Sequence, residues 1–108
     1  MIGKHYKNKR YRRNKFIDKC LNGDGNIVDK FIVDRGHPKG VEVHSITDNA
    51  IIIVRNLESN KLVTKLIARP QQIKRYYEST GRQPPPNYEN ILCLAQWHKV
   101  KGYNKWAY

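Results

Sequence analysis

The stretch VEVHSITDNAIIIVRN, residues 41–56, decides the fold because it predicts two strands and the turn that joins them. Residues 41–46 alternate between apolar and polar side chains, and residues 50–55 are rich in β-branched side chains, as strands are. Asp48 and Asn49 lie between these runs, and both residue types tolerate left-handed backbone. The stretch therefore predicts an antiparallel hairpin.

Two further runs extend this hairpin into a sheet. IVDKFIV, residues 27–33, has the β-branched and aromatic content of a strand. LVTKLIAR, residues 62–69, follows the turn-like segment LESNK. We expect an antiparallel meander of three strands, with the strand 27–33 at one edge.

Helical patterns flank the predicted sheet on both sides. Pro70 suits the first turn of a helix, where a missing N–H costs nothing, and Gly81 can end that helix. Asn87 is a good cap for a last helix. The predicted helices are residues 9–21, 70–80 and 88–100. The fold class is α+β, with an N-terminal helix, a four-stranded antiparallel sheet and two C-terminal helices.

Apolar side chains at regular spacing predict the core. On the strands and the last helix they are Ile52, Val54, Leu66, Ile91 and Leu92, and on the first helix they are Phe16, Ile17, Cys20 and Leu21. One of Tyr76 and Tyr77 is expected in the core, as are Trp97, His98 and Trp106. We interpret Cys20 and Cys93 as buried thiols, although the sequence leaves a disulfide open.

Size and charge restrict the class of protein. The chain has 108 residues, which fits one domain spanning residues 1–108 with a basic and flexible arm at 1–8. Lys and Arg number 21 against 9 Asp and Glu, a net charge of +12. A domain this basic attracts polyanions. There is no apolar run of membrane-spanning length and no clean amphipathic segment, so nucleic acid, RNA above all, is the favoured partner rather than a membrane. An acidic protein stays an alternative partner.

A basic run interleaved with tyrosines begins the chain, KHYKNKRYRRNK at residues 4–15. Such a run suits phosphate contacts and base stacking, although a solvated, frayed terminus that only raises solubility explains it equally. The candidate nucleic-acid-binding residues are Lys7, Lys9, Arg10, Tyr11, Arg12, Arg13, Lys15, Lys65 and Arg75. Histidines and cysteines show no zinc-site spacing, so we expect neither metal nor cofactor. No leader-like segment is evident, so we expect a cytoplasmic protein.

Polar side chains capable of chemistry lie on three neighbouring predicted strands. RNA can be cleaved by its own 2′-hydroxyl, given an acid–base group and donors for the phosphate. His44 or His37 can transfer a proton, and Arg55 and Arg69 can hold the phosphate. Thr64 can donate a hydrogen bond. Glu42 shares a strand face with His44, and it has two interpretations, a member of this group or the partner of a lysine on another strand.

The order of elements and the run from VEVHSITDNAIIIVRN through LVTKLIARPQQIKRYY resemble the barnase–EndoU–colicin–RelE (BECR) group of small RNases, in particular its phage-borne and mobile-element branches. The resemblance covers residues 9–80. His44 matches a strand histidine of that group, and LVTKL matches a late strand with a threonine. The resemblance implies an active site on the sheet. The helix after Asn87 is not a standard part of that fold.

Two functions from different classes follow. The first is a metal-independent, toxin-like ribonuclease of a phage or mobile element, with His44, Arg55, Thr64, Arg69 and His37 as catalytic candidates. The second is a non-catalytic nucleic-acid-binding or inhibitor protein of similar source, which requires only the charge.

Overall fold

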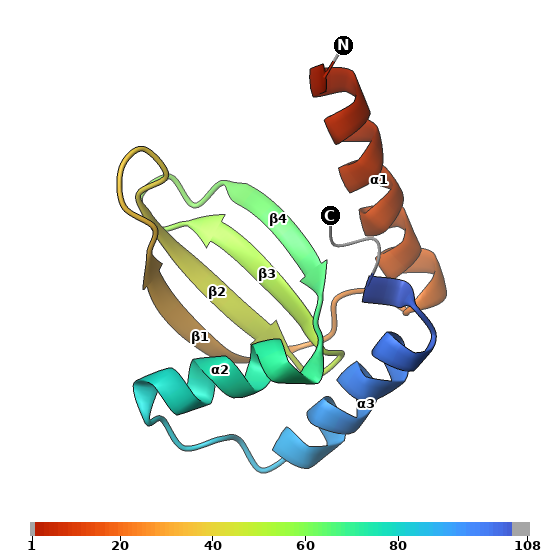
Figure 1. Ribbon diagram of the computed structural model, residues 1–108, viewed down its shortest axis with the longest axis vertical. Helices are drawn as coiled ribbons and strands as arrows, with labels where there is room; N and C mark the ends of the chain where they lie inside the picture. The colour runs from red at the N-terminus through yellow and green to blue at the C-terminus, as the bar shows by residue number, and fades with distance from the viewer. Residues whose placement is uncertain (1, 105–108) are drawn as a thin grey trace.

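The computed structural model describes residues 2–104, and their side chains from residue 10 onward. Helix α1 (Ile2–Cys20) precedes strands β1 (Ile27–Asp34), β2 (Val41–Thr47), β3 (Ile51–Asn56) and β4 (Leu62–Ile67). Helices α2 (Pro70–Thr80) and α3 (Tyr88–Val100) follow. The predicted α+β architecture is confirmed, with strands in the order β1-β2-β3-β4 and every neighbouring pair antiparallel (Figure 1).

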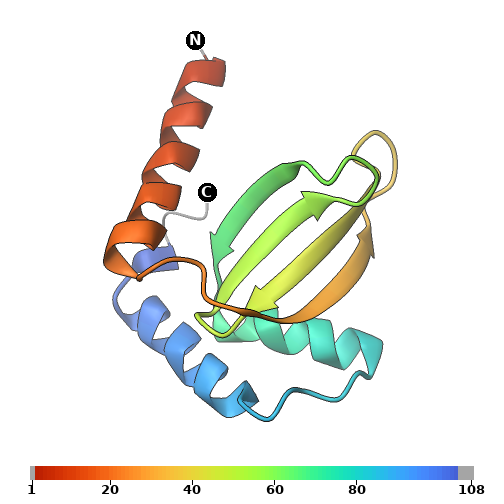
Figure 2. The same cartoon turned by 180° about the vertical axis from the view of Figure 1, so that it is seen from behind.

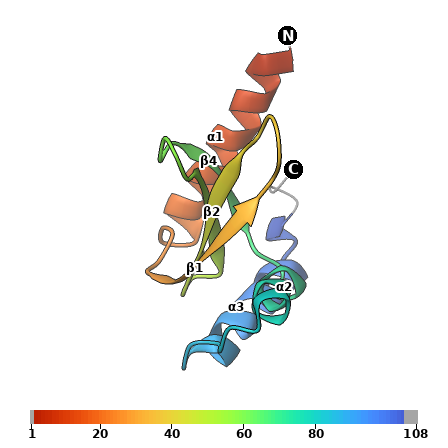
Figure 3. The ribbon, with the colours of Figure 1, turned by 90° about the vertical axis from the view of Figure 1, so that its left-hand side faces the viewer.

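The two faces of the sheet have different coverings. Helices α2 and α3 lie on one face, which we call the helix-covered face (Figures 1 and 3). Phe31, Ile52 and Val54 of that face pack with Ile73 of α2 and Ile91 of α3. On the other face, the open face, no helix crosses the strands in Figure 2. Helix α1 runs beside the β4 edge.

A second apolar cluster joins α1 to the open face. Ile17 of α1 and Leu21, directly after the helix, pack with Ile51, Ile53 and Ile67 at the β3–β4 side of the sheet. The strand period of two explains why Ile51 and Ile53 lie in this cluster, whereas Ile52 and Val54 lie in the other. Tertiary packing of α1 therefore depends on a few side chains near its C-terminal end.

Helix α1 begins earlier than expected, at Ile2 rather than Lys9. The prediction of an arm separate from the helix is wrong for residues 2–8, because these residues continue α1. Lys and Arg propagate a helix well, so the basic composition is compatible with the longer element. The other helix and strand boundaries agree with the predictions within about two residues, the usual scatter of such assignments.

The core prediction is confirmed at most positions. Ile52, Val54 and Ile91 are buried, while Leu66 and Leu92 are half-buried and pack against the same cluster. Tyr77 and His98 are buried as expected, and Trp106 lies outside the described residues.

Three packing predictions are wrong. Cys20 and Cys93 are exposed free thiols, and Trp97 is 46% exposed. In α3 the inward stripe is Ile91, Ala95 and His98, so Cys93 and Trp97 point off that stripe. After Ile17, the next inward position is Leu21, directly after the end of α1, rather than Cys20.

The turn between β2 and β3 is held by the loop that joins α1 to β1. The Asp48 carboxylate accepts a hydrogen bond from the Asn26 backbone N–H at 2.7 Å. The Asn49 side-chain amide donates to the carbonyls of Leu21 and Gly23 at 2.7 and 2.6 Å. Ala50, not Asp48 or Asn49 as predicted, has the left-handed backbone, with φ of 58°. The polar turn residues are used for this long-range attachment.

Gly25 fits closely under that turn. Its φ is +85°, and a Cβ there would lie 2.4 Å from Asp48 Oδ1 and 2.7 Å from Asn49 Cβ. We expect Gly25→Ala to lower the free energy of unfolding by more than ~2 kcal/mol, since backbone strain and a clash act together. Gly23 provides the matched control, because its φ is +88° but its Cβ would meet nothing within 4 Å. Gly23→Ala should lower the free energy of unfolding by about 1–2 kcal/mol, from backbone strain alone. Equal losses in urea unfolding would contradict the close fit.

Candidate active site

The helix-covered face contains a chain of hydrogen-bonded polar side chains. His44 Nε2 lies 2.9 Å from Glu42 Oε1, and His44 Nδ1 lies 2.6 Å from the Tyr76 hydroxyl. Arg35 Nη1 lies 3.4 Å from the same Glu42 oxygen. We call these four residues the His44 chain. It joins the β1–β2 loop, β2 and α2.

The centre of the His44 chain is buried. Glu42 is 4% exposed and His44 is 7% exposed, whereas Arg35 and Tyr76 lie nearer the surface. The carboxylate of Glu42 can only accept, so Nε2 of His44 donates to it. In a neutral imidazole, Nδ1 then accepts the proton of the Tyr76 hydroxyl. A proton entering from outside would therefore reach His44 through Tyr76.

Burial changes the acidity of two tyrosines on α2. Burial raises the pKa of Tyr76 to about 12, with the nearby Glu42 carboxylate adding to the increase and Arg35 opposing it. Burial also raises the pKa of Tyr77, whose hydroxyl donates to the Asp29 carboxylate at 2.8 Å. Both hydroxyls thus keep their protons at neutral pH.

Thr64 lies on the same face as His44. The strand register pairs His44 with Val54, and Val54 with Thr64, so the three form one row across the sheet. Two strand spacings separate the backbones of His44 and Thr64, roughly 10 Å. Arg13 of α1 donates through Nη2 to the Thr64 hydroxyl. The same face of the sheet therefore contains two predicted catalytic residues, His44 and Thr64, and Thr64 contacts a predicted binding residue, Arg13.

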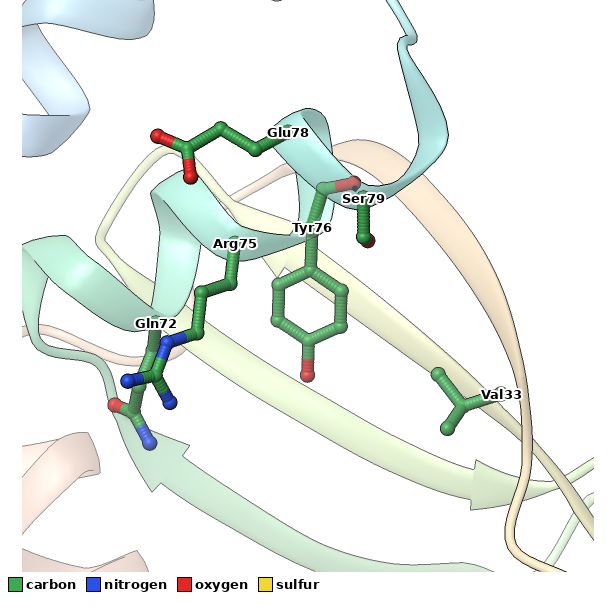
Figure 4. Close-up of a pocket in the computed structure, with 6 residues that line it drawn as sticks. All are labelled: Val33, Gln72, Arg75, Tyr76, Glu78 and Ser79. Atoms are coloured by element: carbon green, nitrogen blue, oxygen red, sulfur yellow. Dashed lines mark hydrogen bonds between the residues drawn. The ribbon is translucent and has the colours of Figure 1, made fainter.

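A pocket of about 670 Å³ adjoins the His44 chain at α2. We call it the α2 pocket. The described residues that line it are Val33, Gln72, Arg75, Tyr76, Glu78 and Ser79. Figure 4 shows Gln72, Arg75 and Tyr76 projecting from the same side of α2 toward the strands. The predicted binding residue Arg75 is thus near Tyr76.

Arg55 does not join this site. The register pairs it through β2 with Val43, so it projects from the open face, away from His44. There it lines a groove of about 600 Å³ together with Lys30 and the exposed apolar residues Ile27, Ile32 and Leu57. The prediction that one surface gathers His44 with Arg55 is wrong, because the two residues differ in strand parity.

The other predicted catalytic residues lie on loops or helix ends. Arg69 is the N-cap residue of α2, five positions beyond Thr64, and its backbone N–H donates to Gln72 Oε1 at 2.8 Å. His37 is exposed in the β1–β2 loop and precedes Pro38 through a cis peptide. No hydrogen bond between the described residues connects either side chain to His44.

Lys65 has a structural partner. Its ammonium lies 2.9 Å from the carboxylate of Asp24, in the loop between α1 and β1. It projects from the open face with Ile53, its partner in β3. The pair ties that loop to β4, so Lys65 is not a free cation for a phosphate.

The basic residues of α1 divide between two sides of the helix. Tyr11, Arg12 and Lys15 are exposed, while Arg13 is buried and Arg10 is half-buried. The side chains of Lys7 and Lys9 lie outside the described part of the chain. One side of α1 therefore presents charge to solvent, and the other presents it toward β4.

Sequence reasoning missed Arg35 and Tyr76 as members of the site. The shared strand face of Glu42 and His44 was the available signal, and it correctly placed those two together. The expected alternative for Glu42, a lysine partner, is wrong, because its partners are His44 and Arg35. Tyr76 reaches His44 only through the packing of α2 on the sheet.

The described side chains include no group of three or more His, Cys, Asp or Glu placed to share a metal ion. Among residues 2–104, no helix is both long and apolar enough to cross a membrane. No family model, no curated protein and no solved structure shows a significant match to the chain. The resemblance to the small RNase group stays a prediction.

The raised pKa of Tyr76 predicts a loss of stability in alkali. The folded protein keeps this hydroxyl protonated to about pH 12, whereas an unfolded tyrosine ionises near its ordinary value of 10. The free energy of unfolding should therefore be unaffected by this group below pH 10 and should fall as pH rises from 10 to 12.

Thermal melting of wild type and Tyr76→Phe over that range measures the effect. We expect the variant to lose less stability with rising pH than wild type. Tyr11→Phe is the matched control, since Tyr11 is 64% exposed, and it should follow wild type. Parallel curves for wild type and Tyr76→Phe would contradict the assignment.

Proposed function

We propose that the protein is a ribonuclease that needs no metal ion and cleaves RNA at the helix-covered face of its sheet. One observation carries the proposal, the buried His44 chain that ends at Tyr76 beside the α2 pocket. Burying a carboxylate and an imidazole is costly, and an apolar pair would stabilise a sheet at least as well. A chemical role explains their presence better than stability does.

The proposed reaction uses the 2′-hydroxyl of RNA as nucleophile. The 2′-hydroxyl gives its proton to the Tyr76 oxygen while the Tyr76 proton passes to His44 Nδ1. Glu42 stabilises the imidazolium that forms, because their separation is only 2.9 Å. The 2′-oxygen bonds to phosphorus, the bond from phosphorus to the 5′-oxygen breaks, and that oxygen takes a proton from water. The hydroxide left from that water takes the extra proton of His44 back through Tyr76, which restores the neutral imidazole. The products are a 2′,3′-cyclic phosphate and a 5′-hydroxyl.

Cations near this chain would stabilise the phosphate. Arg75 lies next to Tyr76 along α2, and Arg13 is hydrogen-bonded to Thr64 in the same face of the sheet. Guanidinium groups bind phosphate oxygens through paired N–H donors, which favours the crowded transition state. The proposal replaces Arg55 by Arg75 as the phosphate-binding group.

Purified protein incubated with total RNA in EDTA tests the proposal. Wild type should cleave RNA, and 2′-deoxy substitution at the cut site should block cleavage. Tyr76→Phe and Glu42→Gln should each slow cleavage by about 10²–10⁴-fold, the usual effect of losing an acid–base group. Tyr76→Phe keeps the ring that packs on Phe31, 5.1 Å between centroids, so folding should be retained.

Arg55→Ala is the control for this experiment. It removes a predicted phosphate-binding cation that lies on the open face, away from His44, so the rate of cleavage should stay within a factor of about two of wild type. Absence of any RNA cleavage by wild type would reject the ribonuclease. Loss of cleavage in Arg55→Ala together with full activity in Tyr76→Phe would reject this site.

Non-catalytic nucleic-acid binding is the second candidate function. Its supporting observation is the outward side of α1, where Tyr11, Arg12 and Lys15 are exposed together. A cation and an aromatic ring on one helix side suit phosphate contact and base stacking. Because RNA is the substrate or the ligand in both candidate functions, a cytoplasmic location is favoured. The resemblance to the small RNases favours a toxin of a phage or mobile element.

An acidic protein is the further partner we propose, for the groove on the open face. None of the described residues lining that groove is acidic, and Lys30 and Arg55 supply positive charge beside apolar side chains. Ile32 is 63% exposed there, so the groove presents apolar surface to solvent. An inhibitor with acidic and apolar side chains would complement this surface.

Salt dependence of RNA binding tests the role of α1. The slope of log K against log salt is about −0.7 per phosphate contact on a single strand. Replacing Arg12 and Lys15 together by Gln should reduce the slope by about 1.4, with unchanged thermal melting. The double Gln variant of Lys99 and Lys101, at the end of α3, is the matched control and should leave the slope unchanged. Equal slopes in all three proteins would contradict a role for α1.

A further inference from the structure

The α2 pocket has the composition of a site for a planar heterocycle with an attached anion. Val33 and the ring of Tyr76 provide apolar walls. Gln72 and Ser79 provide hydrogen-bonding groups, and Arg75 provides the one positive charge of the described lining. At about 670 Å³, its size is within the ordinary range of small-molecule pockets.

The ionic groups of the α2 pocket are not used by the fold. Arg75 and Glu78 make no ion pair and no side-chain hydrogen bond among the described residues, although they are three positions apart on one helix. Gln72 Oε1 accepts from the Arg69 backbone, which leaves its amide N–H groups to donate. Gln72 and Arg75 therefore offer a donor and a cation on the side of α2 from which Tyr76 projects, whereas Glu78 extends from the other side of the helix (Figure 4).

The Tyr76 ring is fixed before any ligand arrives. It packs against Phe31 at 5.1 Å and against His44 at 5.7 Å, and its hydroxyl is bonded to His44. A rigid aromatic wall suits base stacking, because little side-chain entropy remains to be lost. Ser79 is held similarly, since its hydroxyl donates to the Tyr76 carbonyl at 3.3 Å.

We propose that the α2 pocket binds a nucleobase of the RNA, the one whose ribose carries the attacking 2′-hydroxyl. This inference rests on the proposed function and names its specificity site. The base stacks on the Tyr76 side of the pocket, Gln72 meets its polar edge, and Arg75 meets the following phosphate. Placing the base there puts its 2′-hydroxyl next to Tyr76, where the His44 chain begins.

Binding of the four nucleoside 3′-monophosphates, with inorganic phosphate as reference, tests the pocket by calorimetry or NMR titration. At least one nucleotide should bind about 5- to 150-fold tighter than phosphate, the range that base stacking provides. Ser79→Trp places a large ring in the pocket and should abolish this difference while phosphate binding stays. Gln71→Trp is the matched control, on the exposed side of α2 outside the lining, and it should bind nucleotides as wild type does.

A second variant covers the case in which Ser79→Trp does not fold. Gln72→Glu keeps the shape of the side chain and its bond to the Arg69 backbone, but it replaces the amide donor by an acceptor and should change which nucleotide binds best. The inference is overturned if all nucleotides bind like phosphate, or if Ser79→Trp and Gln72→Glu both bind like wild type. Cleavage of RNA without base-dependent binding would leave the ribonuclease and reject the pocket. Base-dependent binding without cleavage would keep the pocket and reject the ribonuclease.

Discussion

The attachment of the β2–β3 turn to the loop between α1 and β1 is the constraint on which the rest of the structure depends. Asp48 and Asn49 hold this turn by hydrogen bonds to residues more than twenty positions earlier in the chain. Because side chains alternate along a strand, a slip of one residue would reverse both faces of the hairpin. The same attachment therefore keeps His44 under α2 and Arg55 on the open face.

The His44 chain is the costliest feature that this register creates. Glu42 and His44 are almost removed from water, and their mutual hydrogen bond with Arg35 and Tyr76 at the ends offsets that cost. A chain of this kind polarises its members and holds each in one orientation. It is pre-organised in the way that proton transfer requires, and it couples a buried imidazole to a pocket wall through one hydroxyl.

Charge is distributed over the molecule by the same packing. Helix α1 packs through Ile17, and Leu21 directly after the helix joins the same cluster, so the other sides of α1 can carry charged residues. Arg13 is directed to Thr64, and Arg12 with Lys15 is directed to solvent. Part of the positive charge is thus directed to the sheet and part to an exposed side of α1. Long polyanions can contact both, since α1 runs beside the β4 edge (Figure 1).

The sequence by itself determined the α+β class, the seven elements, the hairpin and the shared face of Glu42 with His44, because these follow from local periodicity and turn residues. It did not determine the left-handed position at Ala50, the exposure of Cys20 and Cys93, or the partners of Lys65 and Glu42. Those depend on contacts between segments distant in the chain. Only the tertiary structure decided that Arg55 lies on the other face from His44 and that the Tyr76 hydroxyl bonds to His44. Cross-strand register and the docking of α2 on the sheet are set by long-range packing.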